Sequence, residues 1–408
     1  MTEVSDRLHA LDAVRGFALL AGVVFHASMS FLPGTAPLWI VGDVERSASL
    51  GVLSYVLHVF RMTAFFLIAG FFGRMMLHRK GGGGFVRDRL KRIALPLVVF
   101  WPILIVGVVG AAWWGAVVMA KGAPLPPPPK APPGMIAPFP LTHLWFLYLL
   151  MIFYAAMLPA RGIALADRSG RLAALTDRTV SFLIGNPFAP VLLATPLAAA
   201  LYFQTPWLMW FGIPTPDMSL VPNTPAFVGY GVAFAFGWLV QRQADLVQAW
   251  GRRWTLNLVL ALGFTATALA IAGLAPSFET PPQGQRKLLY AAVYSLAVWT
   301  WTLAVIGLAI RFLSGESRAR RYIADASYWL YLIHLPIVMA LQVAVSQVAA
   351  PWPLKFAAIL AAAFAIMFAS YHLLVRRTWL GGWLNGKRHP RPSRIPANSG
   401  PPVEEPAR

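Results

Sequence analysis

The sequence predicts an all-α membrane protein, a polytopic bundle of about ten transmembrane helices with both termini in the cytoplasm. Three observations lead to this fold class. Of the 408 residues, 58% are hydrophobic and only 12% are charged, whereas a soluble domain has about 25% charged residues. Apolar runs recur at the length of about 20 residues that a bilayer-crossing helix needs. Lys and Arg residues collect in every second connection between these runs, as in cytoplasmic loops.

Ten apolar runs are candidate spans. The run at 189–204 is short and contains two prolines, which makes it the weakest candidate. We expect a membrane domain over residues 1–375 and a basic, proline-rich tail over 376–408 that is disordered and cytoplasmic. The candidate spans lie near 11–32, 51–73, 93–119, 143–160, 189–204, 224–240, 254–274, 288–310, 322–345 and 354–375.

The orientation follows from the positive charges. With the N-terminus in the cytoplasm, 26 of the 34 Lys and Arg residues fall on the cytoplasmic side and six on the other. Such a split is the positive-inside pattern. It also accounts for the net charge of +19, so we expect no nucleic-acid partner. The acidic N-terminus and the lack of a small-residue cleavage site predict that the first run stays as a span.

Two outer connections are rich in proline. Residues 123–140 read APLPPPPKAPPGMIAPFP, which predicts a stiff polyproline-like segment. The connection at 205–225 holds five prolines. Each of these connections is either a spacer or a lid over an outward-facing opening.

The first apolar run, Leu11–Phe31, carries Asp12, Arg15 and His26. An ionisable side chain inside a span is costly, so its presence indicates a working site. Asp12 and Arg15 are three residues apart and are therefore neighbours on one helix face. Arg15 and His26 are eleven residues apart, close to three helical turns, so both point the same way about 16 Å apart along the axis. The sequence therefore predicts a polar face that leads from one membrane edge to His26.

The second run adds His58 and Arg61, which are three residues apart and share a helix face. Both are predicted to lie in the outer half of the membrane, as His26 is. Arg61 could extend to the outer interface and bury only its stem, but its distance from the loop favours a buried functional role. For His58, a hydrogen bond to a neighbouring helix explains its presence as well as a role in the site does.

Two later runs also carry polar side chains. His143 and Trp145 open the fourth run; interfacial anchoring explains the tryptophan well, but it does not explain the histidine. In the ninth run, Ser327, Tyr331 and His334 fall at i, i+4 and i+7, on one helix face. Such a stripe serves either contacts between helices or contacts with a substrate. We expect His143, Trp145, Tyr331 and His334 to bind substrate.

The cytoplasmic loop after the second run is dense in basic residues, most of which membrane orientation explains. Arg89 and Arg92, however, are three residues apart at the start of a helix. Arginine binds phosphate in a bidentate manner, so this pair is also a good anion clamp.

At these residues the sequence resembles the acyltransferase-3 family of integral membrane acyltransferases. Five matching segments occur in the family's order and span most of the chain. Within the family, the HVFRM form of the second run resembles members that succinylate periplasmic glucans. The five segments are LDAVRGFALLAGVVFH (11–26), FRMTAFFLIAGFF (60–72), RLKRIALP (89–96), HLWFLYLLMIFY (143–154) and SYWLYLIHLPI (327–337).

The resemblance implies an O-acyltransferase of the bacterial inner membrane. The co-substrate would be a cytoplasmic acyl-CoA, either succinyl-CoA or acetyl-CoA, and the acceptor would be a hydroxyl group of a periplasmic glucan or other glycan. The family's first-span arginine and histidine match Arg15 and His26, and its inner-loop pair matches Arg89 and Arg92. These three arginines would bind the CoA. No fused hydrolase-like outer domain is expected, which favours direct transfer to the acceptor.

Acyl transfer needs a base for the attacking hydroxyl and a positive group near the carbonyl oxygen. His26 is the expected base or, alternatively, a transient acyl carrier. Arg61 would stabilise the oxyanion or bind a carboxylate, and His58 would orient His26 or Arg61. A thioester is already activated, so we expect no metal. The chain has no cysteine, which excludes thiolate metal sites and a cysteine nucleophile.

A transporter or flippase for an anionic metabolite or glycolipid is the rival prediction, because it too would place charges inside the membrane. The sequence lacks the inverted internal repeat that transporters often show. A scaffold protein would not need the Arg15–His26 face. The acyl group, the acceptor, the formation of an acyl-enzyme and the formation of a homo-oligomer stay open.

Overall fold

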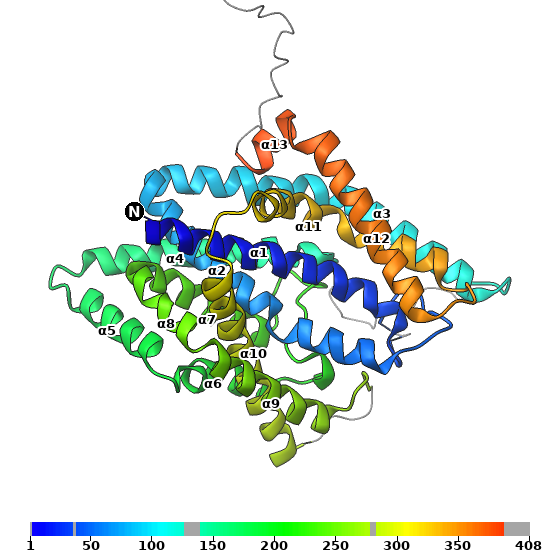
Figure 1. Ribbon diagram of the computed structural model, residues 1–408, viewed down its shortest axis with the longest axis horizontal. Coiled ribbons are helices and arrows are strands. Elements are labelled where there is room, and N and C mark those ends of the chain that lie inside the picture. The colour runs from blue at the N-terminus through cyan, green and yellow to red at the C-terminus, as the bar shows by residue number, and fades with distance from the viewer. Residues whose placement is uncertain (1, 36–37, 126–138, 278–282, 387–408) are drawn as a thin grey trace, which may run out of the picture.

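The structure is a computed structural model that describes residues 2–35, 38–125, 139–277 and 283–386. In these ranges the regular structure is helical, without strands, and the predicted all-α membrane bundle is confirmed (Figure 1). The α-helices are α1 (Thr2–Ser28), α2 (Ala48–Arg89), α3 (Leu95–Ala120), α4 (Trp145–Ala166), α5 (Arg171–Gly185), α6 (Ala189–Phe203), α7 (Thr224–Val240), α8 (Gln248–Arg252), α9 (Trp254–Ala272), α10 (Gln285–Phe312), α11 (Arg318–Val345), α12 (Trp352–Ser370) and α13 (Trp379–Leu384).

Short 3₁₀ and π segments extend or link these helices. The π segment η2 joins α2 to α3 without an intervening loop and contains Arg92. The short segments are η1 (Met29–Phe31), η2 (Leu90–Ala94), η3 (Thr142–Leu144), η4 (Met209–Phe211), η5 (Gln241–Val247) and η6 (Tyr371–Val375).

Seven helical segments in the described ranges are long and apolar enough to cross a membrane, or eight if the bent pair α5 and α6 forms one span. One of the seven, Ala48–Ala120, is 73 residues long, which as one helix would be over three times the bilayer's hydrocarbon thickness of about 30 Å. Gly81, inside α2, interrupts it with a non-helical φ of 68° and ψ of 175°, so the segment consists of two helical stretches, 48–80 and 82–120. Helix α7, with 17 residues, is at the short end for a span. The count of ten spans stays a prediction.

Contacts at both ends of α1 show that α1 and α11 run parallel. Near the start of α1, a Cβ on Gly16 would lie 3.8 Å from the Ala324 backbone, early in α11. Near the end of α1, the Gln342 amide, late in α11, donates to the His26 carbonyl at 2.9 Å. The polar face of α1 therefore runs alongside the polar stripe of α11.

Helix α2 packs against α1 in the opposite direction. Ser54, early in α2, hydrogen-bonds Ser28 at the end of α1, with an Oγ–Oγ distance of 2.5 Å. Phe72, later in α2, lies under the Arg15 guanidinium, 5.9 Å from its ring centroid. Since Gly81 follows and the chain turns back into α3, the Gly81 turn lies at the end of the bundle where α1 begins.

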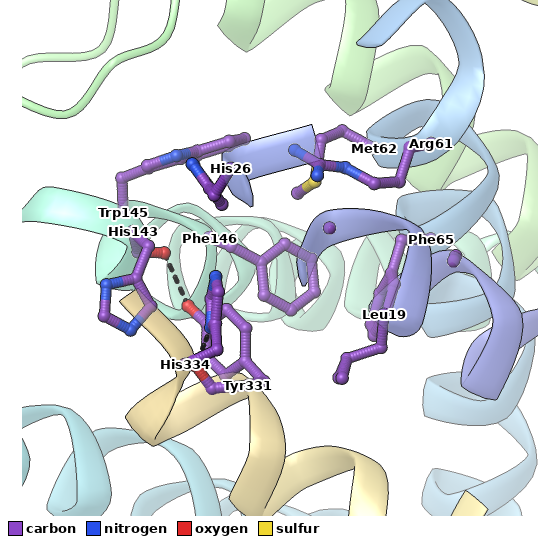
Figure 2. A pocket seen from close by; sticks show the side chains of 12 residues that line it. Leu19, His26, Arg61, Met62, Phe65, His143, Trp145, Phe146, Tyr331 and His334 are labelled. Carbon is purple, nitrogen blue, oxygen red and sulfur yellow. Dashed lines mark hydrogen bonds between the residues drawn. The ribbon is translucent and has the colours of Figure 1, made fainter. Parts of the chain in front are cut away.

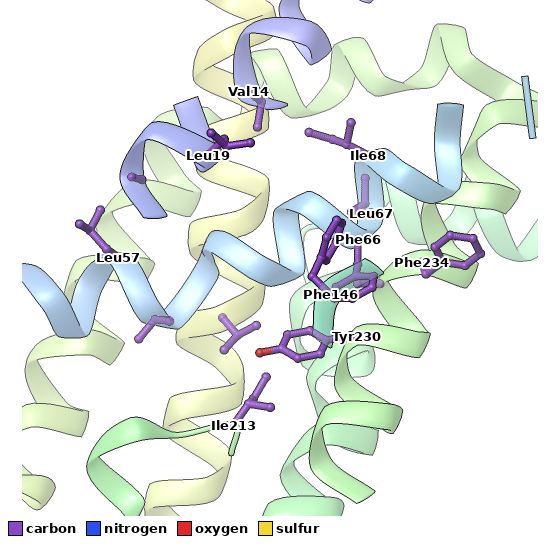
Figure 3. Close-up of a cluster of buried hydrophobic side chains, with 14 of the residues drawn as sticks. Val14, Leu19, Leu57, Phe66, Leu67, Ile68, Phe146, Ile213, Tyr230 and Phe234 are labelled. Atoms are coloured by element: carbon purple, nitrogen blue, oxygen red, sulfur yellow. The ribbon is translucent and has the colours of Figure 1, made fainter. Parts of the chain in front are cut away.

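Two glycines allow α2 and α7 to approach closely. A Cβ on Gly237 would lie 1.9 Å from the Leu67 carbonyl oxygen, and a Cβ on Gly70 would lie 2.0 Å from the Phe234 carbonyl oxygen. Side chains here would force the helix backbones apart. Figure 3 shows the aromatic and aliphatic core that α1, α2, α4 and α7 form around this seam.

The outer loop after α1 folds back onto the bundle. Asp43 forms an ion pair with Lys355 of α12, and the side chains are only 1% and 3% exposed, respectively. A second outer connection, within 205–225, is also packed: Trp207 and Ile213 are 2% exposed and Trp210 is 3% exposed. It is therefore not a loose spacer. Most of the predicted polyproline segment, 126–138, lies outside the described residues.

The two ends of the described chain lie at one end of the bundle. His9 of α1 contacts Glu316, just before α11, at 3.5 Å. Trp383 of α13 donates to the Lys91 carbonyl at 2.7 Å, so helical structure continues past residue 375. Residues 387–408 of the predicted tail lie outside the described residues. That this end faces the cytoplasm stays a prediction from the charges.

Candidate active site

One cavity collects most of the predicted site residues (Figure 2). Its volume is about 50 Å³, enough for a few water molecules. Side chains from α1, α2, α4, α11 and the adjoining η3 surround it, so helices far apart in the sequence build one site. The lining residues are Ala18, Leu19, Gly22, His26, Arg61, Met62, Phe65, His143, Trp145, Phe146, Tyr331 and His334.

His26 enters the cavity from the last turn of α1. Its ring stacks on Trp39 of the outer loop, with ring centroids 5.9 Å apart. Besides binding the His26 carbonyl, Gln342 accepts a hydrogen bond from Trp39 Nε1 at 2.9 Å. The His26 Nδ1 atom is buried and has no hydrogen-bonding partner in the described part of the chain. Gln342 thus holds the backbone of His26 and Trp39 packs against its ring, while the Nδ1 atom of the ring can still form a hydrogen bond.

Arg61 enters the cavity from α2 and is only 7% exposed. It does not extend to the membrane surface. Its guanidinium packs on α1: a Cβ on Gly22 would lie 3.0 Å from Nη1, and the Phe25 ring centroid is 4.8 Å from Cζ. Within the described ranges, Nη1 is buried without a partner. A buried cation of this kind is costly unless an anion joins it, so the cavity is suited to a negative group.

Hydrogen bonds connect the side chains from α11 and η3. Tyr331 Oη donates to the His143 carbonyl at 2.7 Å, and His143 Nε2 lies 3.1 Å from the Leu332 carbonyl. His334 Nδ1 lies 2.7 Å from the Tyr331 carbonyl. The His334 ring centroid is 5.2 Å from that of His26 and 4.8 Å from that of His143. Three histidines therefore meet in one small space.

Trp145 and His58 differ in their relation to this space. Trp145 is 7% exposed, lines the cavity and stacks on Tyr230 with centroids 5.5 Å apart, so it does not anchor the chain at the membrane interface. His58 does not line the cavity. Its ring stacks on Phe25 at 5.1 Å, and Arg61 lies over the same phenylalanine. His58 can therefore act only indirectly, through Phe25.

Arg15 lies outside the cavity, with its side chain 35% exposed. It pairs with Asp12 at 3.2 Å and reaches the Ala324 carbonyl of α11 at 3.5 Å. Because it also lies over Phe72 of α2, it occupies the same α2–α11 side of α1 that His26 occupies further along.

Arg89 and Arg92 share a buried carboxylate. Asp88, whose side chain is 4% exposed, contacts Arg89 Nη2 at 2.6 Å and Arg92 Nε at 3.3 Å, and it also pairs with Lys80. Arg92 Nη1 also reaches the Asn385 carbonyl at 3.5 Å. We call Lys80, Asp88, Arg89 and Arg92 the Asp88 cluster. Three cations around one anion leave a net positive charge, which suits phosphate.

Two tyrosines connect the Asp88 cluster to the cavity. Tyr328 Oη donates to the Arg92 carbonyl at 2.7 Å, and its ring stacks on Tyr331, with centroids 6.4 Å apart. Tyr331 lines the cavity. Tyr328 and Tyr331 thus form a row of side chains on α11 that leads from the Asp88 cluster to the cavity.

The outer connections also approach this region. Leu141, two residues before His143, donates its backbone N–H to the Asp217 carbonyl at 2.7 Å. Burial raises the pKa of the Asp217 carboxyl to about 6. This carboxylate is outside the spans, and it stays mostly ionised at neutral pH and loses its charge as the pH falls through about 6.

Sequence reasoning missed several residues that hold the site. Trp39 and Gln342 fix His26, Asp88 holds both arginines, and Tyr328 connects the cluster to Tyr331. Only Tyr328 had a usable signal, since it lies three residues before Tyr331 on one helix. Among the described residues, no group of three or more His, Asp or Glu side chains has the arrangement of a metal site.

Comparisons with known proteins find related sequences over most of the chain. A family model described as an acyltransferase domain, of the acyltransferase-3 type, matches residues 8–372. Glucans biosynthesis protein C of Escherichia coli strain K12 is 23% identical over 352 residues, which cover 82% of this chain and 83% of the relative. The protein of the same name from Shigella dysenteriae serotype 1 is 23% identical over 351 residues with the same coverage. No solved structure matches the chain.

Proposed function

This chain belongs to the acyltransferase-3 family of membrane O-acyltransferases, and from this premise we propose that it carries an acyl group across the bacterial inner membrane. The donor is a cytoplasmic acyl-CoA, and the acceptor is a hydroxyl group of a glucan on the outer side. The observation that carries the proposal is the cavity where His26, Arg61 and His334 each present a buried nitrogen that has no partner among the described residues. Unpaired buried polar atoms are expensive, and a reacting substrate would satisfy them.

The chemistry follows from these groups. His26 accepts the proton as the acceptor hydroxyl attacks the thioester carbonyl, and the departing sulfur receives a proton in return. Arg61 faces the negative charge that develops on the carbonyl oxygen. His143, Trp145 and Tyr331 shape the wall against which the acyl group lies. Each of these groups comes from a rigid helix or from η3 beside it, which favours precise orientation.

The Asp88 cluster is the proposed site for the CoA phosphates. Its net positive charge, its place at the end of the bundle where α1 begins and its connection to the cavity through Tyr328 support this assignment. Arg15, on the same side of α1 as His26, would guide the pantetheine arm between the two places. The CoA thioester would then reach the cavity from the cluster side.

Two features favour a succinyl group and a glucan acceptor. A succinyl group carries a free carboxylate, and the guanidinium of Arg61 would pair with it in the cavity. The relatives with matching length are named for glucan biosynthesis. Mass spectrometry of envelope glycans from cells with and without the gene is the direct test: a gene-dependent mass increase on glucan supports the proposal, and an unchanged glycan profile contradicts it.

Replacing Arg89 or Arg92 by glutamine should weaken CoA binding by roughly 10- to 150-fold, because each change removes charge-assisted phosphate contacts of about 1.5–3 kcal/mol. Isothermal titration calorimetry with CoA and with dephospho-CoA measures the loss. Asp88→Asn is the matched control, because it removes the shared anion and leaves all three cations. Weaker CoA binding in Asp88→Asn would mean that the cluster is structural and does not bind phosphate.

A further inference from the structure

We infer that His334 is a positioning residue that fixes the tautomer of His26, and that the Tyr331 carbonyl fixes the tautomer of His334 in turn. The inference rests on the proposed function for the role of His26 as base. Its first test, however, needs no substrate. The Tyr331 carbonyl sets the direction of the whole arrangement, because a carbonyl oxygen can only accept a hydrogen bond.

The contact with Tyr331 decides where His334 carries its proton. His334 Nδ1 lies 2.7 Å from the Tyr331 carbonyl oxygen, so Nδ1 must be the N–H donor. A neutral imidazole has only one N–H, which leaves a lone pair on Nε2. That atom is buried and has no hydrogen-bonding partner within the described ranges. In Figure 2 the His334 ring extends from α11 into the cavity, toward His26.

His26 can supply the hydrogen-bond donor that the His334 Nε2 lone pair can accept. Its Nδ1 is also buried without a partner in the described structure, and the two ring centroids are 5.2 Å apart with the planes tilted by 41°. A small rotation of either ring, or one water molecule in the cavity, would join an Nδ1–H of His26 to the Nε2 lone pair of His334. The His26 proton then resides on Nδ1, and its Nε2 lone pair is free to act as the base.

Arg61 is the competing partner for His26. Its buried Nη1 also has no partner in the part of the chain that the structure describes, and a guanidinium can only donate. If Arg61 donated to His26 Nδ1, the His26 proton would move to Nε2 and neither ring nitrogen would be free to accept the hydroxyl proton. The two pairings therefore predict opposite tautomers of His26, and this difference can be measured.

The contact also helps during the reaction. The acceptor O–H bond breaks as its oxygen bonds the acyl carbon, and the proton moves to His26 Nε2. The resulting imidazolium keeps its Nδ1–H on His334 Nε2, which stabilises the positive charge. The C–S bond then breaks, and the sulfur takes the proton from His26 Nε2. The products are the ester and free CoA, with both histidines returned to their starting form.

The first test is ¹⁵N NMR of the purified protein with labelled histidine, in which His26 and His334 are assigned by substitution among the eight histidines. We expect both to show the Nδ1–H tautomer. In His334→Ala, His26 should change to Nε2–H, whereas in His334→Gln the amide oxygen can still accept and His26 should keep Nδ1–H. An Nε2–H form of His26 in the unmodified protein, or no change in His334→Ala, would overturn the inference.

His143→Gln is the matched control. In the unmodified protein, the His143 ring centroid lies 4.8 Å from that of His334. Both ring nitrogens of His143 already have partners, because Nε2 is hydrogen-bonded to the Leu332 carbonyl and Nδ1 lies 3.5 Å from Thr142 Oγ1. Losing this ring removes similar packing and leaves the contact of His26 with His334 intact. The His26 tautomer should therefore stay unchanged in His143→Gln; a change there equal to that in His334→Ala would show a packing effect.

The second test is kinetic and uses acetyl-CoA and succinyl-CoA as donors. His334→Ala should lower kcat roughly 10²-fold, the effect of a misplaced catalytic group, with KM unchanged. His334→Gln should recover most of this loss. Equal loss in both variants would mean that His334 itself moves the proton, which overturns a positioning role. If the unmodified protein transfers no acyl group, the proposed function fails, while the tautomer measurement still decides the inference.

Discussion

His26→Gln should be as inactive as His26→Ala, with both losing roughly 10²–10⁴-fold of the acyl-transfer rate, the usual contribution of a general base. Glutamine retains hydrogen-bonding groups but cannot accept the proton. The backbone contacts of His26 with Gln342 do not involve the ring, so both variants should keep their thermal stability. Single-turnover transfer from a radiolabelled acyl-CoA, run beside thermal melts, measures both quantities.

CoA binding separates loss of chemistry from loss of the donor. The Asp88 cluster lies at the opposite end of the Tyr328–Tyr331 row, so both His26 variants should bind CoA as the unmodified protein does. A histidine that only connects helices gives the opposite pattern, in which glutamine restores activity and alanine lowers the melting temperature. An active His26→Gln variant would remove His26 from the catalytic role.

Arg61→Met should lower the transfer rate by roughly 10²–10³-fold, the usual cost of removing one donor to a developing oxyanion. Methionine is apolar and of similar length, and the guanidinium it replaces is buried, with Nη1 unpaired within residues 2–35, 38–125, 139–277 and 283–386. The variant should therefore fold at least as well, because it removes a buried charge. Rates with succinyl-CoA and acetyl-CoA, beside thermal melts, test this expectation.

The two donors also distinguish between the roles proposed for Arg61. Stabilising the oxyanion predicts equal losses in kcat with both donors. Binding the succinyl carboxylate adds a rise in KM with succinyl-CoA alone. Arg61→Lys keeps the charge but not the planar guanidinium, so its transfer rate should lie between those of the unmodified protein and Arg61→Met. Rates within tenfold of the unmodified protein in Arg61→Met, with either donor, would contradict both roles.

Helical spacing predicted much of the candidate site. Asp12 and Arg15 lie together because residues three apart are neighbours on a helix. Tyr331 and His334 line one cavity for the same reason. The cost of burying ionisable groups in a membrane singled out His26 and Arg61, which line the same cavity. These inferences depend only on one helix and its solvent, which a sequence specifies well.

Contacts between distant segments could not be predicted in this way. Trp39 and Gln342 are 303 residues apart, and nothing in either segment indicates that they meet beside His26. Asp88 lies in a run of basic residues that membrane orientation explains. The sequence therefore does not indicate that Asp88 is the shared ion-pair partner of Arg89 and Arg92. His58 shares a spacing with Arg61 yet lies behind Phe25, because spacing gives a helix face but not the side chains that cover it.

In the fold too, features of single segments could be predicted from the sequence and contacts between segments could not. The helical class follows from the apolar runs, and the break at Gly81 falls in the run of four glycines, 81–84, between the second and third apolar runs. The short run at 189–204 is α6 in the structure. Its 15 residues are too few to cross the membrane alone, and it forms with α5 a pair of helices bent by 105°. Such a bend depends on neighbouring helices, so local pattern does not predict it.

The most direct test of transmembrane acyl transfer compares sealed inside-out and right-side-out membrane vesicles. Both receive radiolabelled acyl-CoA, which does not cross membranes, in the external medium. The account predicts labelled glucan in the lumen of inside-out vesicles, where the Asp88 cluster faces the donor, and no label in right-side-out vesicles. His26→Gln vesicles, in which donor binding persists without chemistry, should stay unlabelled in both orientations. Equal labelling of external acceptor in right-side-out vesicles would contradict the account, because donor and acceptor would then react on the same side of the membrane.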